Sequence, residues 1–130
     1  MANGCFDLLH VGHIRYLRGA RSCGDILVVA LNSDRSVRKL KGPGRPLFDQ
    51  EERGVILSAL EMVDYITVFD EETVHQTLLA LKPHIHAKGS DYTVETVPER
   101  ETVKSYGGKT VIVGGDKVRS TSEVIQDMAR

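Results

Sequence analysis

The sequence predicts a single α/β domain in which a doubly wound parallel sheet lies between two layers of helices. Short apolar runs alternate with helical patterns along the chain, the order that strand–helix–strand units produce. The run ILVVAL, at residues 26–31, is apolar without alternation, which is typical of a strand covered on both faces. With 130 residues, the chain fits one domain, residues 1–130, that buries about two-thirds of its unfolded surface.

Four strands are expected from the apolar runs, at residues 26–31, 65–69, 85–88 and 110–113. A further strand should lead into the loop NGCFD, at residues 3–7, but only Met1 and Ala2 precede that loop. We therefore expect this first strand to be a stub or to be missing.

Helices are expected where apolar residues recur at helical spacing between capping residues. Val11, Ile14 and Leu17 recur in this way directly after the opening loop. Asp49 and Glu52 are typical of the start of a helix that carries residues 55–60. Three further helices are expected: residues 73–81, stopped by Pro83; a helix opened by Pro98 that ends at Gly107-Gly108; and residues 121–128, opened by a capping box of Ser120 and Glu123.

Composition narrows the functional classes. The chain has 17 basic and 18 acidic residues, a net charge of −1, and so lacks the broad basic surface of a nucleic-acid binder. No apolar run approaches the roughly 18 residues of a membrane span, and no signal peptide opens the chain. We expect a cytoplasmic protein that binds neither nucleic acid nor membrane. The two cysteines, Cys5 and Cys23, are expected to be reduced thiols.

His10 and His13 stand at the start of the first expected helix and allow four interpretations. A zinc site needs three or four ligands, and only two are in reach here. A nucleophile–base pair would have to use Cys5, which lacks the surrounding sequence of a nucleophile elbow. Two histidines of purely structural importance are the third possibility.

The fourth interpretation, which we favour, is a phosphate site. A turn that opens a helix presents backbone N–H groups and the positive end of the helix dipole to an anion. The two histidines add side-chain donors, and Gly12 lets a phosphate approach the backbone closely. The chain has no Walker-type loop, so it would hold phosphate by other means.

The segments NGCFD (3–7) and HVGH (10–13) resemble the signature of the HxGH nucleotidyltransferase superfamily, and share the spacing of its glycerol-3-phosphate cytidylyltransferase-like group. Ser120-Thr121-Ser122 is similar to the Ser-Thr-Thr segment that opens the last helix of that family and faces the nucleotide phosphates. The resemblance implies a Rossmann-like, three-layer nucleotidyltransferase fold.

Residues 40–53, residues 86–92 and the turn Gly107-Gly108-Lys109 resemble the adenylyltransferase family of ADP-heptose synthesis. This resemblance implies transfer of AMP from ATP to D-glycero-β-D-manno-heptose 1-phosphate, giving pyrophosphate and ADP-heptose, a precursor of the lipopolysaccharide core. It further implies Mg²⁺ bound with ATP, a homodimer, and a heptose kinase on a separate polypeptide.

Two alternatives stay open. One is a glycerol-3-phosphate cytidylyltransferase, or another enzyme acting on a small phosphate. Gly115 stands where cytidylyltransferase relatives carry an arginine, which argues mildly against it. The other is a truncated nucleotide-binding domain without turnover, which the short first strand keeps open.

The resemblance also implies roles for individual residues. The catalytic residues are His10, His13 and Lys41. The nucleotide-binding residues are Asn3, Gly4, Phe6, Asp7, Gly12, Lys88, Gly89, Asp91, Arg119, Ser120 and Thr121. The substrate-binding residues are Arg53 and Tyr92, and no residue is expected to be a dedicated metal ligand.

Several of these residues have a second interpretation. Phe6 is equally consistent with the core, and Lys41 with a solvated lysine. Asp7 would hold Mg²⁺ through water or orient His10, and Arg53 would otherwise form a surface ion pair with its glutamate neighbours. Outside these positions, His84 and His86 share a strand face and are expected to be structural, one exposed and one partly buried.

Overall fold

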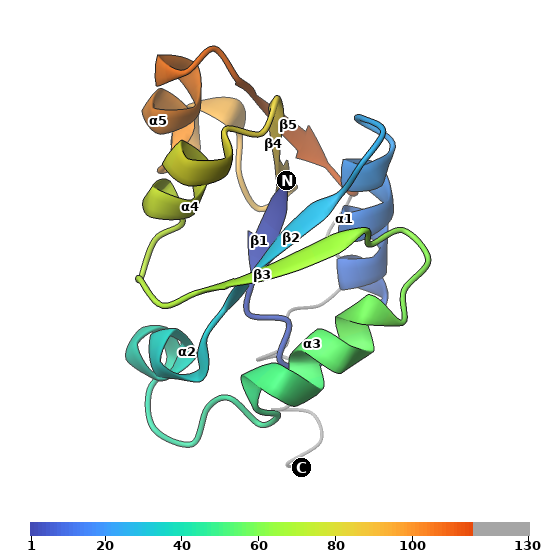
Figure 1. Ribbon diagram of the computed structural model, residues 1–130, viewed down its shortest axis with the longest axis vertical. Helices are drawn as coiled ribbons and strands as arrows, with labels where there is room; N and C mark the ends of the chain where they lie inside the picture. The colour runs from blue at the N-terminus through green and yellow to red at the C-terminus, as the bar shows by residue number, and fades with distance from the viewer. Residues whose placement is uncertain (116–130) are drawn as a thin grey trace.

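The structure, a computed structural model, describes residues 1–115, and these form three layers (Figure 1). The middle layer holds β1 (Ala2–Gly4), β2 (Val28–Asn32), β3 (Tyr65–Phe69), β4 (Ile85–Gly89) and β5 (Lys109–Val113). The helices are α1 (Val11–Arg21), α2 (Asp34–Lys41), α3 (Gln50–Ser58), α4 (His75–Leu81), the 3₁₀ turn η1 (Val94–Thr96) and α5 (Arg100–Ser105). The helix expected at residues 121–128 lies outside the described residues.

All strands pair in parallel, β1 with β2, β2 with β3, and β4 with β5. Met1 joins the two sets, because its amino group donates to the Ile85 carbonyl at 2.7 Å and its carbonyl accepts from the Ala87 N–H at 2.9 Å. The strands therefore follow the order 3-2-1-4-5. Strands β2 and β3 are added on one side of β1, whereas β4 and β5 are added on its other side. Sheets of this kind bind ligands beside this switch point, at the carboxyl ends of the strands.

Two apolar cores lie on opposite faces of the sheet. On β2, Val29 and Leu31 pack with Leu17 of α1 and Leu57 of α3. The residue between them, Ala30, belongs to the other core, with Phe69 of β3 and residues of α4 and α5. Successive residues of a strand point to opposite faces, so the uninterrupted apolar run reflects cover on both sides. The doubly wound, three-layer prediction is confirmed.

The first strand is present as a stub, one of the two expected alternatives. It is three residues long and includes Asn3 and Gly4, which the sequence analysis had placed in a loop. Its pairing explains it: Ala2 lies opposite Val29 of β2, and Met1 bonds to β4 on the other side. Hydrogen bonds to strands on both sides hold β1 in the sheet, although the segment is too short to show the sequence pattern of a strand.

Helix α2 was not predicted. Ser33 caps it by accepting the Ser36 N–H at 3.1 Å, and Gly42 ends it with a φ of 92°. The only residues of this helix that are buried are Ser36 and Val37. A single buried apolar residue defines no apolar face, because Leu40 is 50% exposed. The helix is therefore specified by its cap and by the Ser36 hydroxyl, which donates to the Glu71 carbonyl.

The remaining elements follow the sequence closely. The strand expected at residues 65–69 matches β3, and the run at 26–31 forms a strand two residues later than its start. Asp49 caps α3 by accepting the Glu52 N–H at 2.8 Å, as predicted. His84, directly before β4, is exposed as expected, whereas His86 on β4 is fully buried and not partly buried. Cys5 and Cys23 are free thiols.

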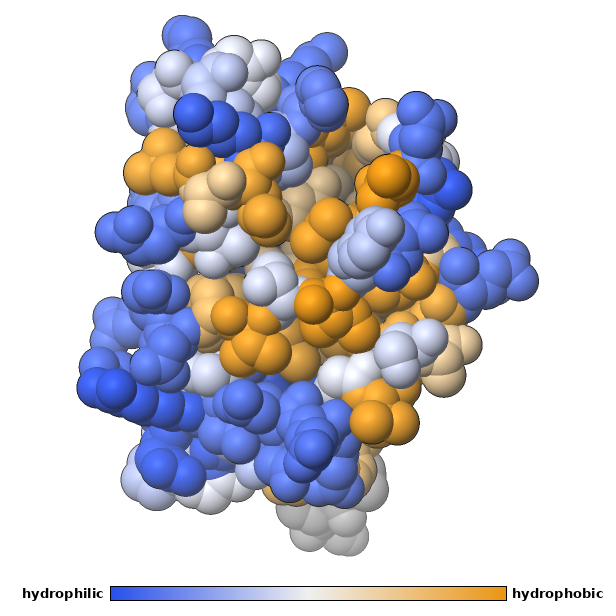
Figure 2. Space-filling view, in the orientation of Figure 1, coloured by the Kyte–Doolittle hydropathy of each residue, from blue (hydrophilic) through white to orange (hydrophobic). Residues whose placement is uncertain are grey.

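Strand β3 forms one edge of the sheet within residues 1–115, and it leaves apolar side chains uncovered. Tyr65 is 62% exposed and Val68 is 46% exposed. Figure 2 shows apolar residues gathered across the middle of this face, above a hydrophilic area. None of the helices described here is long and apolar enough to cross a membrane.

Burial of His86 predicts sensitivity to acid. Burial, with the charges of Lys88, the amino terminus and His75, lowers its pKa from 6.5 to about 3. As the pH falls, His86 of the unfolded chain binds a proton before His86 of the folded protein does. The contribution of neutral, buried His86 to stability is therefore complete above about pH 6.5 and is lost as the pH falls toward 3. We expect the melting temperature to drop between about pH 7.5 and pH 5, and to drop less in His86→Gln. The exposed His84→Gln variant should behave as wild type; an equal drop in all three proteins would contradict the assignment.

Candidate functional site

The start of α1 brings His10 and His13 together. The Nδ1 atom of His10 accepts the Gly12 N–H at 3.1 Å, and the Nδ1 atom of His13 accepts the His10 N–H at 3.2 Å. The ring centroids are 4.0 Å apart. Because each Nδ1 accepts a hydrogen bond, each neutral ring carries its proton on Nε2. The local sequence therefore builds a pair of imidazoles with two Nε2–H donors at the positive end of a helix.

Burial and the charges nearby keep His13 neutral. Burial lowers the pKa of His13 to about 4, helped by His10 and by the positive charge of Lys41. Lys41 ends α2 and is exposed, yet its ammonium also acts on the thiol of Cys5. Lys41 is thus near enough to His13 and to Cys5 for its charge to lower the pKa of both groups.

Phe6 links β1 to α1 and lies in the core, which was the alternative to its predicted role as a nucleotide wall. It is 5% exposed, and its ring centroid lies 5.4 Å from that of His13 and 6.5 Å from that of Tyr16. Its φ of 48° is unusual for a residue other than glycine, and such strain persists only where packing enforces it. A Cβ at Gly4 would approach the Phe6 ring to 3.1 Å, so Gly4 leaves room for this packing.

Tyr16 ties the ends of β1 and β4 to α1, a role that the sequence analysis missed. Its hydroxyl donates to the Ala87 carbonyl at 2.6 Å and accepts the Asn3 N–H at 3.2 Å. Burial raises the pKa of Tyr16, which keeps the hydroxyl protonated. The Asn3 side chain also bonds to His86 of β4, with 2.8 Å between Oδ1 and Nε2. These bonds fix the switch point of the sheet beneath the histidine pair.

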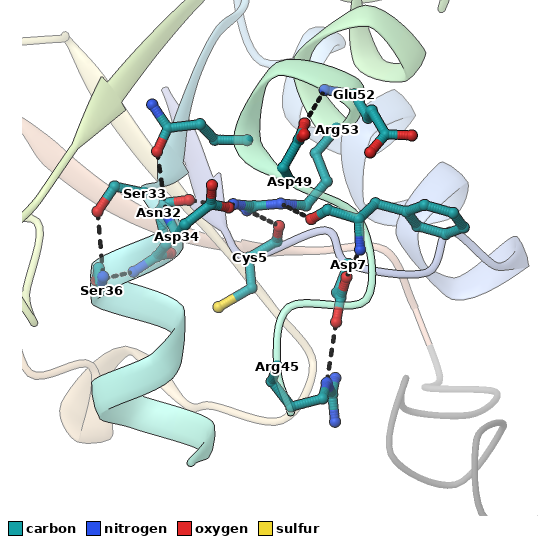
Figure 3. A network of polar contacts seen from close by, with 12 residues as sticks. Cys5, Asp7, Asn32, Ser33, Asp34, Ser36, Arg45, Asp49, Glu52 and Arg53 are labelled. Carbon is teal, nitrogen blue, oxygen red and sulfur yellow. Dashed lines mark hydrogen bonds and ion pairs between the residues drawn. The ribbon is translucent and has the colours of Figure 1, made fainter. Parts of the chain in front are cut away.

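The Asp7 carboxylate contacts the loop before α3, which neither of its two predicted roles had included. It is buried and accepts from the N–H groups of Leu47 and Phe48, at 2.8 and 3.1 Å, and from Nε of Arg45 at 2.9 Å. Burial opposes its ionisation, but the two backbone bonds and the guanidinium outweigh it and lower the pKa of Asp7. Asp7 therefore anchors the loop between α2 and α3 (Figure 3).

Arg45 is a candidate that sequence reasoning missed. Its side chain is 15% exposed, and among residues 1–115 its Nη2 atom has no hydrogen-bond partner. Arg45 lies within residues 40–53, a segment used in the sequence analysis only for the family resemblance, and this position could have identified it as a candidate. Arg45, in the loop between α2 and α3, is thus a second cation of the candidate site beside Lys41, which ends α2.

Arg53 is buried rather than paired with neighbouring glutamates on the surface. Its guanidinium donates to the carbonyls of Phe48, Cys5 and Asn32, at 2.9, 2.7 and 2.8 Å. A fourth bond, from Nη2 to Asp34 at 2.8 Å, completes the network in Figure 3. With its donors used inside the protein, Arg53 positions the loop, β1, β2 and α2 and does not face a substrate.

The carboxyl end of β4 holds a second group of predicted residues. The Nζ atom of Lys88 lies 4.7 Å from the centre of the Tyr92 ring, and the Tyr92 N–H donates to the Gly89 carbonyl at 3.1 Å. Burial lowers the pKa of Lys88, while Glu99 and Asp91 oppose that change. The side chain of Asp91 is exposed. The strand order puts this group beside β1.

The predicted residues Arg119, Ser120 and Thr121 lie outside the described residues. The expectation that the last helix faces the phosphates from the side opposite α1 therefore stays a prediction.

The geometry defines a doubly wound α/β domain with a pair of imidazoles at the start of α1, beside the switch point of the sheet. The chain belongs to the cytidylyltransferase-like family, whose pattern matches residues 1–129.

Two similar proteins share the name bifunctional protein HldE. That of Pelobacter propionicus is 54% identical over 124 residues, 95% of this chain and 25% of the relative. That of Geobacter sulfurreducens is 52% identical over 128 residues, 98% of this chain and 26% of the relative. The chain thus spans about a quarter of these relatives.

A solved structure is also similar over most of its length. The lipopolysaccharide core biosynthesis protein from Thermoplasma volcanium has a TM-score of 0.75 and 32% sequence identity. The match covers 92% of this chain and 96% of that one.

Arg53 predicts a large stability effect. In Arg53→Met the Asp34 carboxylate and three carbonyls lose their donor, so we expect a loss of about 3–5 kcal/mol in the free energy of unfolding. The matched control is Arg35→Met, which removes an exposed pair with Asp70 at 3.4 Å and should change stability by less than about 0.5 kcal/mol. Urea denaturation measures both; similar small effects would show that the Arg53 network contributes little.

Proposed function

We propose that this chain transfers AMP from ATP to D-glycero-β-D-manno-heptose 1-phosphate, with release of pyrophosphate and formation of ADP-heptose. The observation that carries the proposal is the pair His10 and His13, whose Nδ1 atoms both accept backbone N–H groups at the start of α1 and leave Nε2 as the donor. The motif segments support the choice of substrates, and the similarity to a lipopolysaccharide core biosynthesis protein agrees with an activated sugar as product.

The proposed step is an in-line displacement at the α-phosphorus of ATP. An oxygen of the sugar 1-phosphate forms a bond to this phosphorus, and the bond to the pyrophosphate oxygen breaks. Such a transfer needs positioning and charge stabilisation more than covalent participation by the protein. His10 and His13 donate hydrogen bonds to the phosphate oxygens as charge builds up, while the Lys41 ammonium neutralises the triphosphate.

Mg²⁺ would bind at this site through the phosphates of ATP and not through a dedicated set of protein ligands. Residues 1–115 contain no group of three or more His, Cys, Asp or Glu placed to hold a metal ion. The Asp7 carboxylate is already taken up by Arg45 and two backbone N–H groups. Mg²⁺ retains waters and binds substrate phosphates readily, so it would enter with the nucleotide and neutralise part of its charge.

Further contacts are assigned by position at the carboxyl ends of β1 and β4. We assign Asn3, Gly4, Gly12, Lys88, Gly89 and Asp91 to the nucleotide and Tyr92 to the sugar, with Arg119, Ser120 and Thr121 completing the phosphate site. Asp7 and Arg53 act by holding the loop that carries Arg45. A heptose kinase must supply the sugar 1-phosphate.

We also propose a homodimer. Strand β3 is a free sheet edge within the described residues, and the exposed Tyr65 and Val68 lie on it. Uncovered apolar surface of this kind favours association with a partner, and a second copy of the chain is the partner that the family resemblance implies.

Substrate choice tests the proposal directly. We expect pyrophosphate release to be faster with ATP and heptose 1-phosphate than with CTP and heptose 1-phosphate. We also expect it to be faster than with ATP and glycerol 3-phosphate. Equal or better turnover with CTP and glycerol 3-phosphate would favour a cytidylyltransferase. Binding of ATP without turnover of any pair, by a protein with a cooperative thermal transition, would indicate a nucleotide-binding domain alone.

Loss of His13 should affect catalysis far more than stability. His13→Ala removes one phosphate donor, worth about 3–4 kcal/mol of barrier, so we expect kcat to fall by at least about two orders of magnitude. It also removes a helix cap, which costs about 1 kcal/mol of stability.

Asp49→Ala is the matched control, because it removes the cap of α3 and leaves the histidine pair in place. It should lose a similar amount of stability and keep its turnover. Normal turnover in His13→Ala, or unfolding well below the control, would show that the histidine is structural.

A further inference from the structure

Glu99 is a buried acid without a partner among residues 1–115. It is 5% exposed, and within these residues its carboxylate makes neither a hydrogen bond nor an ion pair. It directly precedes α5, yet its side chain does not cap that helix. Asp7, which is also buried, has three donors by contrast. Burial of a carboxylate without a partner is unfavourable, so Glu99 needs an explanation outside the packing of the fold.

Glu99 lies at the carboxyl ends of the strands, on the opposite face of the sheet from α1. Just after α5, the Tyr106 hydroxyl donates at 2.9 Å to the carbonyl of Pro83, which precedes β4. Helix α5 therefore runs antiparallel to β4, and Glu99 at its start is level with the end of β4. Figure 1 shows α4 and α5 on one side of the sheet and α1 on the other. Glu99 thus approaches the ends of the strands from the side opposite to His10 and His13.

Two neighbours show where the carboxylate of Glu99 lies. Burial lowers the pKa of Lys88 and raises the pKa of Tyr16, and the charge of Glu99 counteracts the first change and adds to the second. Charges have such effects at short range, so Glu99 lies near both side chains. The Tyr16 hydroxyl donates to the Ala87 carbonyl, near the end of β4, at 2.6 Å. The carboxylate therefore lies beside the switch point between β1 and β4, where sheets of this kind bind ligands.

The surroundings of Glu99 suit a ligand with hydroxyl groups. A carboxylate only accepts hydrogen bonds, so it repels the phosphates of either substrate and needs a donor. Its oxygens are not among the fully sealed, unpartnered side-chain atoms of residues 1–115, so they remain open to such a donor. A metal ion would need further ligands, and the described residues have no group of three or more that could hold one. The Lys88 ammonium and the Tyr92 ring, 4.7 Å apart, add a cation and an aromatic wall to the same region.

We propose that Glu99 accepts hydrogen bonds from two neighbouring ring hydroxyls of a substrate, those of the ATP ribose or those of the heptose. This inference rests on the proposed function for the identity of the two substrates, and the hydroxyl pair is common to both. The two oxygens of one carboxylate match two adjacent O–H donors, and hydrogen bonds to a charged acceptor are strong. Such a pair of bonds fixes the orientation of the ring and, through it, of the phosphate that must reach His10 and His13.

Calorimetric titration of the full chain with one substrate at a time separates the two sources of hydroxyls. If Glu99 holds the ribose, wild type should bind 2′-deoxy-ATP at least about tenfold more weakly than ATP. The Glu99→Gln variant should then bind both nucleotides about equally, because the interaction that distinguishes them is lost. If Glu99 holds the heptose, the variant should bind heptose 1-phosphate at least about tenfold more weakly than wild type does, with its affinity for ATP unchanged.

Glu101→Gln is the matched control, because it makes the same change at an exposed position of α5 and should bind every ligand as wild type does. A structural role for Glu99 would lower the melting temperature of Glu99→Gln. We expect this temperature to stay the same or to rise, since the wild-type carboxylate is buried without a partner. Unchanged affinities in Glu99→Gln, or an equal loss for ATP, 2′-deoxy-ATP and heptose 1-phosphate, would overturn the proposal.

These binding measurements do not depend on catalysis, so they separate this inference from the proposed function. If wild type turns over its substrates and Glu99→Gln binds them normally, the proposed function stands and the role of Glu99 is wrong. If the ribose pattern is found but no substrate pair is turned over, the role of Glu99 stands and the proposed function is wrong. A protein that binds neither ATP nor heptose 1-phosphate would contradict both.

Discussion

The buried guanidinium of Arg53 is the interaction on which the rest of the site depends. It joins the turn after β1, through Cys5, to the end of β2, through Asn32, and it holds the loop before α3 and the start of α2 as well. The turn at Cys5, residues 32–34 and the loop at Phe48 therefore meet at one side chain. A planar group with several donors can make these bonds simultaneously, which a lysine at the same position could not do.

The loop that Arg53 holds is held again by Asp7. The Asp7 carboxylate binds this loop through two backbone N–H groups and through Arg45. Asp7 follows Phe6, whose strained backbone turns the chain from β1 toward α1. The position of the loop, and of its cations, is thus coupled to the position of the first turn of α1. This coupling lets a short chain build a site from segments that would otherwise move independently.

The histidine pair shows how the fold selects one protonation state. Burial and the charge of Lys41 favour the neutral form of His13, and the backbone bonds to both Nδ1 atoms leave the protons on Nε2. A neutral donor needs no proton transfer before it stabilises growing negative charge, and its orientation is set by the helix cap. Cationic charge is supplied separately by Lys41 and Arg45, which end and follow α2. Division of these tasks between α1 and the loop is consistent with the proposed transfer of a nucleotidyl group.

The sequence by itself determined what depends on neighbours along the chain. The fold class, the strands with apolar runs, the cap at Asp49 and the joint placement of His10 and His13 all follow from local patterns, because caps and periodicity act over a few residues. Only the tertiary structure decided the three-residue β1, helix α2 and the inward direction of Asp7 and Arg53. Each of these depends on partners tens of residues away, and a buried charge or a short strand is stable only when those partners satisfy its hydrogen bonds.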